Sequence, residues 1–230
     1  QGLPQIPFQE RTKAPLQTIH GGHFNMAENR TFLLCVDTLG SGTGHHIHDG
    51  HFDNTYITGN GSAGHLYMCG SSINSSPTIK RIGFTNAGST FANPVGTMNS
   101  AVDAVTLAVA SNSAECSPVT EFFNANAPAG SQDLIFFGVQ NLGSGANCGG
   151  GGCVMSINVT GTPGTLTIAN SIPEIDGPSG IIVYNDANTT TYPQASSLYF
   201  SNQGNSTSGV PCGATVGVGC AVKVTQAGLK

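Results

Sequence analysis

The chain has 230 residues and a formal net charge of −5, and only 8% of its residues are charged, against roughly 25% in an average globular domain. No lysine or arginine occurs between Arg81 and Lys223, so the sequence lacks the basic footprint of a nucleic-acid-binding protein. Its apolar runs are far shorter than the ~20 residues that cross a bilayer, so the sequence predicts no membrane span.

The N-terminal segment 1–28 predicts an extended arm or linker, followed by one domain over 29–230. Three prolines among the first 16 residues block a helix and discourage a central strand. The segment contains more isolated apolar residues, among them Ile6 and Phe8, than a tail in solvent usually has. Two interpretations stay open: a disordered terminus, or an arm whose Ile6 and Phe8 dock on an exposed sheet edge of a neighbouring subunit.

All seven histidines lie between His20 and His65. The densest stretch combines imidazoles with carboxylates, which together can bind Zn or Cu. The candidate metal ligands are His45, His46, His48, Asp49, His51 and Asp53. A loop whose histidines bond to the backbone or lie in solvent explains the same pattern, and the H-E-x-x-H motif of zinc proteases is missing from the sequence.

Strand signals dominate the rest of the chain, since short β-branched or aromatic runs alternate with Gly, Asn, Ser and Pro clusters. Helical periodicity is nearly absent, and its one instance, 101–110, reads equally well as a strand. The sequence therefore predicts an all-β fold. The predicted strands are 31–36, 65–70, 78–84, 133–139, 153–159, 180–185, 197–202 and 220–225.

Three of these strands begin similar units. Leu66, Leu134 and Leu198 align with one another at spacings of 68 and 64 residues, and each is followed by a polar loop and a second alternating strand. A unit of about 65 residues with four short strands is typical of a large β-propeller blade. The spacing predicts three to four antiparallel four-stranded blades, a partial propeller or one completed by another chain.

The seven cysteines in this weakly charged chain indicate an oxidising compartment. Two pairs close short loops just before a return strand, and we predict the disulfides Cys148–Cys153 and Cys212–Cys220. The sequence does not choose among Cys35, Cys69 and Cys116. Cys35–Cys69 is the preferred pair because both residues lie on neighbouring predicted strands.

Four carboxylates, Asp103, Glu115, Glu121 and Asp133, lie near predicted strand ends. Two of them could form the acid pair of a glycosidase, but the sequence does not give the separation that this mechanism requires.

Several strings in the sequence resemble one protein family in the same order along the chain. They are FDNTYITGNGSAGHLYMCG (52–70), DLIFFGVQ (133–140), GPSGIIVYND (177–186) and GCAVKVTQAGL (219–229). These strings look like the C-terminal blades of secreted bacterial β-propeller proteins. The resemblance implies a propeller fold and an exported location, and it implies no catalytic residues.

The sequence favours a non-catalytic extracellular protein, secreted or at the cell surface, over an enzyme. Open strand edges and blade faces would bind other copies of the chain, the remaining blades of a longer propeller or a surface ligand, with a filament as one outcome. The alternative is a secreted metal-dependent hydrolase or lyase that uses the histidine cluster.

Overall fold

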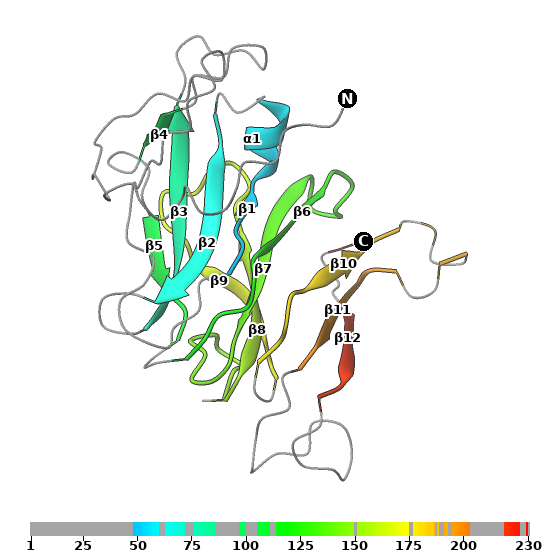
Figure 1. Ribbon diagram of the computed structural model, residues 1–230. Coiled ribbons are helices and arrows are strands. Elements are labelled where there is room, and N and C mark those ends of the chain that lie inside the picture. Colours follow the sequence, from blue (N-terminus) through cyan, green and yellow to red (C-terminus); the bar gives the residue numbers. More distant parts are fainter. Residues whose placement is uncertain are drawn as a thin grey trace, which may run out of the picture.

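The computed structural model describes residues 48–59, 63–71, 76–85, 97–99, 105–110, 114–149, 151–174, 177–186, 188, 191–192, 195–202, 219–225 and 229. The described residues form twelve β-strands and one short helix, which confirms the predicted all-β fold (Figure 1). No helix in this part of the chain is long and apolar enough to cross a membrane. Ile6, Phe8, Cys35, His45, His46 and Cys212 lie outside the described residues.

The strands form three antiparallel sheets in chain order. The first sheet contains β1 (His51–Phe52), β2 (His65–Ser71), β3 (Pro77–Thr85), β4 (Thr97–Asn99) and β5 (Val105–Ala108), and both β4 and β5 pair with β3. The second sheet has the order β6 (Thr120–Asn124), β7 (Gln132–Val139), β8 (Cys153–Asn158) and β9 (Ile168–Pro173). The third has the order β10 (Ile182–Tyr184), β11 (Ser197–Ser201) and β12 (Ala221–Thr225).

The short helix α1 (Asn54–Thr58) connects β1 to β2. Asp53 caps its N-terminus by accepting a hydrogen bond from Tyr56 N at 2.8 Å, the usual way in which a side-chain oxygen satisfies a free amide of the first turn. The chain returns to β2 through Gly64, which has a φ of +90°. Because a Cβ at Gly64 would overlap Asp53 and the backbone of Tyr56, this tight return requires glycine.

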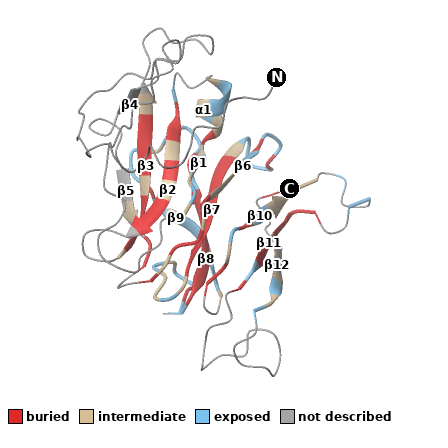
Figure 2. Ribbon diagram, viewed as in Figure 1, coloured by how far each residue is buried: buried red, intermediate tan, exposed pale blue. Residues whose placement is uncertain are grey.

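The second sheet lies between the other two, and much of β7 and β8 is buried (Figure 2). It has an apolar face toward each neighbouring sheet. Ile135 and Phe137 of β7 pack in the first core cluster, which includes Tyr67 and Ile79 of the first sheet. Leu134 and Phe136, which point to the opposite face, pack in the second cluster with Leu198 and Phe200 of the third sheet. Burial on both faces explains why β7 is a nearly continuous apolar run.

The repeat found in the sequence coincides with the second strand of each sheet, because Leu66, Leu134 and Leu198 lie on β2, β7 and β11. Their side chains do not point to equivalent sides. Leu134 and Leu198 belong to one cluster and so face each other. If the sheets were equivalent blades stacked in the same orientation, aligned leucines would instead point in the same direction. The aligned leucines therefore do not mark equivalent blade faces.

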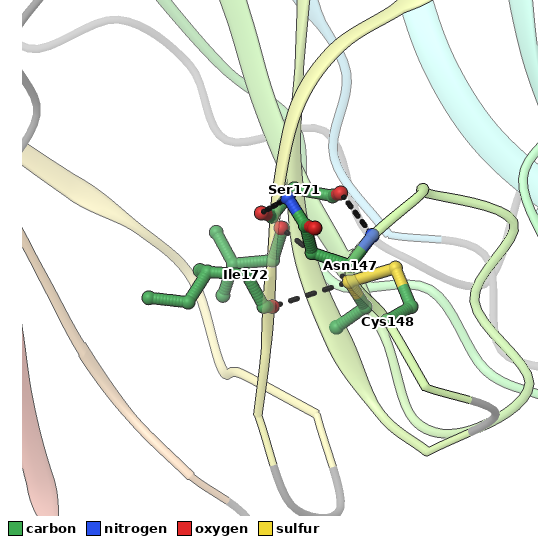
Figure 3. The surroundings of a disulfide bond; sticks show 6 residues. Asn147, Cys148, Ser171 and Ile172 are labelled. Carbon is green, nitrogen blue, oxygen red and sulfur yellow. Dashed lines mark hydrogen bonds between the residues drawn. A yellow bond between two sulfur atoms is a disulfide. The ribbon is translucent and has the colours of Figure 1, made fainter.

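Two disulfides are described. The predicted Cys148–Cys153 bond is confirmed, and its loop is tied to β9 by hydrogen bonds from Asn147 N to Ser171 Oγ (3.0 Å) and from Asn147 Nδ2 to Ser171 O (3.2 Å) (Figure 3). Cys220 is also disulfide-bonded. Its predicted partner, Cys212, lies outside the described residues, so this pairing stays a prediction.

The preferred Cys35–Cys69 pair is wrong, because Cys69 is bonded to Cys116. Cys116 lies in the segment that enters the second sheet, where it forms an isolated bridge with Val139 of β7. Both sulfurs are buried in the first cluster, so the bond crosses between two packed sheets. The sequence-based choice considered only strands that follow one another along the chain, and such a choice misses partners brought together by sheet packing.

Candidate functional site

Polar side chains gather where the first sheet faces the second. Tyr67 pairs with His51 of β1 and Arg81 of β3, so these three side chains lie on one face of the first sheet. His65 lies two residues before Tyr67 and shares that face. From the second sheet, Glu121 is paired with Ile135, and Asp133 precedes Ile135 by two residues, so both point toward the first sheet. The acid–histidine cluster comprises Asp53, His65, Tyr67, Arg81, Glu121 and Asp133.

Asp53 and His65 form a buried pair within this cluster. Asp53 Oδ2 lies 2.9 Å from His65 Nδ1, while Asp53 Oδ1 accepts hydrogen bonds from Tyr56 N and from His65 N at 3.0 Å. Burial by itself raises the pKa of Asp53, but the bond from His65, the two backbone N–H groups and the His65 charge outweigh it and lower the pKa. Asp53 is therefore an ionised, fully bonded carboxylate that closes the turn between β1 and β2.

Glu121 and Asp133 form a second pair of opposite character. Burial, a hydrogen bond to Asp133 and the negative charges of Asp133 and Asp53 raise the pKa of Glu121 to about 8. The pKa of Asp133 is also raised, mainly by burial, although the N–H of Asn54, the bond to Glu121 and the His51 charge oppose the shift. Because two adjacent buried carboxylates repel each other, the pair shares one proton at neutral pH.

Four buried polar atoms of the cluster have no hydrogen-bond partner in the described structure: Tyr67 Oη, Arg81 Nε, Glu121 Oε1 and Asp133 Oδ1. Arg81 uses Nη1 instead, as a donor to the carbonyl of Pro163. Two of the four atoms are acceptors, one is a donor and the Tyr67 hydroxyl is both.

His51 lies at the rim of the cluster. Its Nδ1 is 3.7 Å from Glu121 Oε2, and its side chain is 47% exposed whereas that of Glu121 is 12% exposed. The imidazole therefore lies between the buried acid pair and solvent.

The cluster also connects two sheets. Asp133 Oδ2, on β7, accepts a hydrogen bond from Asn54 N at 2.9 Å, and Asn54 begins α1. Val119 N, next to β6, donates to Asp49 O at 3.1 Å. Asp133 thus holds the start of α1 against the second sheet, and the backbone bond between Val119 and Asp49 supports the same contact.

The predicted metal ligands do not converge within the part of the chain that the structure describes. Asp53 is turned inward to His65, and His51 lies against Glu121. Across the described ranges, no group of three or more His, Cys, Asp or Glu side chains is placed to hold a metal ion. His48 and Asp49 are described, and His45 and His46 are not, so the predicted Zn or Cu site has no support from its described members.

The sequence indicated part of this cluster. The sequence places the carboxylates Glu121 and Asp133 near predicted strand ends, and the β6–β7 hairpin brings them together. His65, Tyr67 and Arg81 were not predicted as site residues. The sequence does contain a signal for two of these residues. His65 and Tyr67 alternate along one strand, so their side chains point to the same face. If that face is buried, both polar groups lie inside the core.

Comparisons with protein-family models, with curated proteins and with solved structures find no significant match to this chain.

Proposed function

We propose that this protein is a non-catalytic extracellular structural or adhesive protein whose stack of sheets is continued by other copies of the chain. In this proposal the three sheets are blades of a partial propeller, as the resemblance to secreted bacterial propeller proteins implies. The support is that each sheet is built from consecutive strands, and that the first strands β1 and β10 both contact β6. Closed propellers have roughly 4–8 blades, more than the three sheets described.

The observation that carries the proposal is the outer face of the third sheet. Val183 and Leu198 pair with each other and pack toward the second sheet, so the neighbouring pair, Ile182 and Tyr199, points to the opposite face. Ile182 is 67% exposed, the largest exposed fraction among the exposed large hydrophobic side chains that the structure describes. In this proposal, Ile182 is the apolar side chain of the outer face that a further copy of the chain would cover.

The acid–histidine cluster supports a structural role over catalysis. Five of its six members are buried and the Glu121 side chain is 12% exposed. Asp53, His65 and Asp133 bond to backbone groups or to each other. The cluster binds α1 and the first sheet to the second sheet. A metal-dependent hydrolase, the alternative predicted from the sequence, gains no observation in its favour from the described residues.

Export fits the cysteine chemistry. Cys69–Cys116 and Cys148–Cys153 are both formed and buried, and disulfides persist mainly in oxidising compartments. Together with the low content of charged residues, these bonds support a secreted or surface location.

Sedimentation velocity over a concentration series, with electron microscopy for filaments, tests the proposal. We expect the full chain to self-associate and Ile182→Glu to weaken the association by roughly tenfold or more, since a charge replaces a buried apolar contact. Ile57→Glu is the matched control, because Ile57 is 60% exposed on α1. A chain that stays monomeric throughout, or equal effects of the two variants, would contradict the proposal.

A further inference from the structure

The chain contains two Asp-Gly pairs, Asp49–Gly50 and Asp176–Gly177. In such a pair the main-chain nitrogen of the glycine can attack the side-chain carboxyl carbon of the aspartate, because glycine has no side chain that shields its nitrogen. The product is a five-membered cyclic imide. In a folded protein this attack requires access to both reacting groups, and the two glycine nitrogens have different surroundings.

The Asp49–Gly50 pair lies directly before β1, and Asp49 is exposed. Asp53 N donates to His65 O at 3.0 Å, so these two residues form a hydrogen-bonded pair at the end of the β1–β2 ladder. Hydrogen-bonded and non-hydrogen-bonded pairs alternate along antiparallel strands. Two and three residues earlier, His51 therefore bonds to β2 and the N–H of Gly50 points away from β2.

The N–H of Gly177 is already used in a turn. It donates to Glu174 O at 3.4 Å. Gly177 also lies against the main chain of Val139 and Gln140, which a Cβ at this position would overlap. Attack by this nitrogen requires that the turn first opens. Asp176 itself lies outside the described residues.

We propose that Asp49 is a site of spontaneous isomerisation to isoaspartate in the folded protein. Ring closure joins Gly50 N to Asp49 Cγ and expels one water molecule, formed from the hydroxyl of the carboxyl group and the proton of the amide. Water then opens the imide at one of its two carbonyl carbons. Opening at the main-chain carbonyl leaves isoaspartate, and opening at the side-chain carbonyl restores aspartate. The inference does not depend on the proposed self-association.

The product changes the connection between the first and second sheets. In isoaspartate the main chain runs through Cβ and Cγ of residue 49, and the former main-chain oxygen becomes part of a free carboxylate. This oxygen accepts the N–H of Val119 at 3.1 Å. Gly50 cannot take up the extra length by moving toward β2, because even a Cβ there would lie 2.5 Å from Tyr67 O. Isomerisation should therefore displace the start of β1 and weaken its contact with the second sheet.

Incubation of the folded full chain at neutral pH, in water enriched in the heavy oxygen isotope, measures the reaction. Each opening of the imide places one heavy oxygen in the residue, and electron-transfer fragmentation of the released peptides distinguishes isoaspartate from aspartate. We expect isoaspartate and label at Asp49. Labelling at Asp49 should exceed that at Asp176 by roughly fivefold, the factor expected if the Gly177 hydrogen bond must first open.

The same chain, reduced and unfolded in urea, is the control for the fold. It gives the intrinsic ratio of the two Asp-Gly rates, by which the ratio in the folded protein is divided. Asp186 is an internal control in every peptide map, since its carboxylate accepts a hydrogen bond from Asn188 N at 2.7 Å and should stay unlabelled. No label at Asp49, or a corrected ratio of one between Asp49 and Asp176, overturns the proposal.

The variant Asp49→Ser separates this reaction from other changes during ageing, because serine cannot form the imide and all other reactive pairs are kept. Urea unfolding of fresh and incubated samples should show a lower midpoint only in the unmodified protein. The decrease should be proportional to the isoaspartate content at position 49. Equal decreases in both proteins would show that Asp49 does not cause the loss, and would overturn the predicted weakening of the contact between the sheets.

Discussion

Glu121 and Asp133 show how one buried proton can help hold two sheets together. The β6–β7 hairpin places both carboxyl groups on the face toward the first sheet, and Asp133 also accepts the amide of Asn54. Both pKa values are raised, chiefly by burial. When the shared proton leaves, two adjacent charges remain in a poorly solvated site, which destabilises the contact between the sheets.

The stability of the protein should therefore decrease as pH rises through the range in which Glu121 titrates. Its pKa is 4.5 in an unperturbed side chain and about 8 in the fold, so between these pH values the folded state binds more protons than the unfolded state. This contribution is complete below pH 4.5 and is lost as pH rises through about 8. Glu121→Gln should flatten the dependence by on the order of 1–3 kcal/mol.

Urea unfolding at pH 5, 6.5 and 8 measures the effect. Glu115→Gln is the control, since it makes the same substitution outside the cluster. An unchanged slope of unfolding free energy against pH in the Glu121→Gln variant would show that the pair does not hold the shared proton.

The sequence identified some of these residues as candidates and missed how they meet. It marked Asp53 as a metal ligand because carboxylates and histidines are crowded in that stretch. The structure gives Asp53 a partner, His65, that lies 12 residues further on and across a strand pair. Proximity along the chain does not show which of several histidines a carboxylate faces, because the turn between β1 and β2 decides it.

At the scale of elements, β7 has the most demanding packing, since it is buried against both neighbouring sheets. Gly138 allows one of these contacts. A Cβ at this position would overlap the ring of Pro178, which lies beside the third sheet through its bridge to Asn202. The missing side chain thus permits the segment before β10 to lie against β7.

Gly138→Ala should destabilise the fold by on the order of 1–3 kcal/mol, because the backbone near Pro178 must shift to admit a methyl group. Gly164→Ala is the matched control, since a Cβ there meets no atom within 4 Å. Thermal unfolding of both variants measures the difference. Equal melting temperatures would mean that Pro178 moves away without cost.

Strands that carry many apolar residues were the easiest to predict. The predicted strand 133–139 differs from β7 by one residue at its start, because burial on both faces leaves an apolar run. β9, Ile168–Pro173, was missed, since it lies at a sheet edge and four of its six residues are exposed. The one-turn helix α1 was also missed, because its five residues are too few to show helical periodicity.

At the scale of the molecule, the spacing of Leu66, Leu134 and Leu198 correctly indicated successive antiparallel sheets, but not the side to which each leucine points. A shift of one residue moves a side chain to the other face of a strand, and a sequence alignment does not register such a shift. The succession of antiparallel sheets was therefore predictable, whereas the contacts between the described sheets required the structure.

The two described disulfides should contribute unequally to stability. Cys69–Cys116 joins residues 47 positions apart, and Cys148–Cys153 joins residues 5 apart. From the loss of unfolded-chain entropy, the longer closure is worth about 4 kcal/mol and the shorter about 2 kcal/mol. The double variant Cys69→Ala/Cys116→Ala should therefore lose more unfolding free energy than Cys148→Ala/Cys153→Ala.

Guanidinium unfolding of the two double variants, each against the unmodified protein, measures both losses. The second variant is the control for removing two buried sulfurs. A larger loss for the Cys148–Cys153 variant would show that the short loop and its bonds to Ser171 matter more than the constraint between the sheets.

The Cys69–Cys116 bond also fixes how the protein would respond to being pulled. β3, β4 and β5 lie between the two cysteines along the chain, so a stretching force passes through the sulfurs and bypasses these strands. The segment between the two cysteines spans 47 residues and would add roughly 160 Å of length if extended. The force cannot extend this segment until the disulfide is reduced. Under tension, unfolding of the first sheet from its N-terminal side would stop at Cys69. Reduction of the disulfide would then allow the segment between the cysteines to extend in a single step.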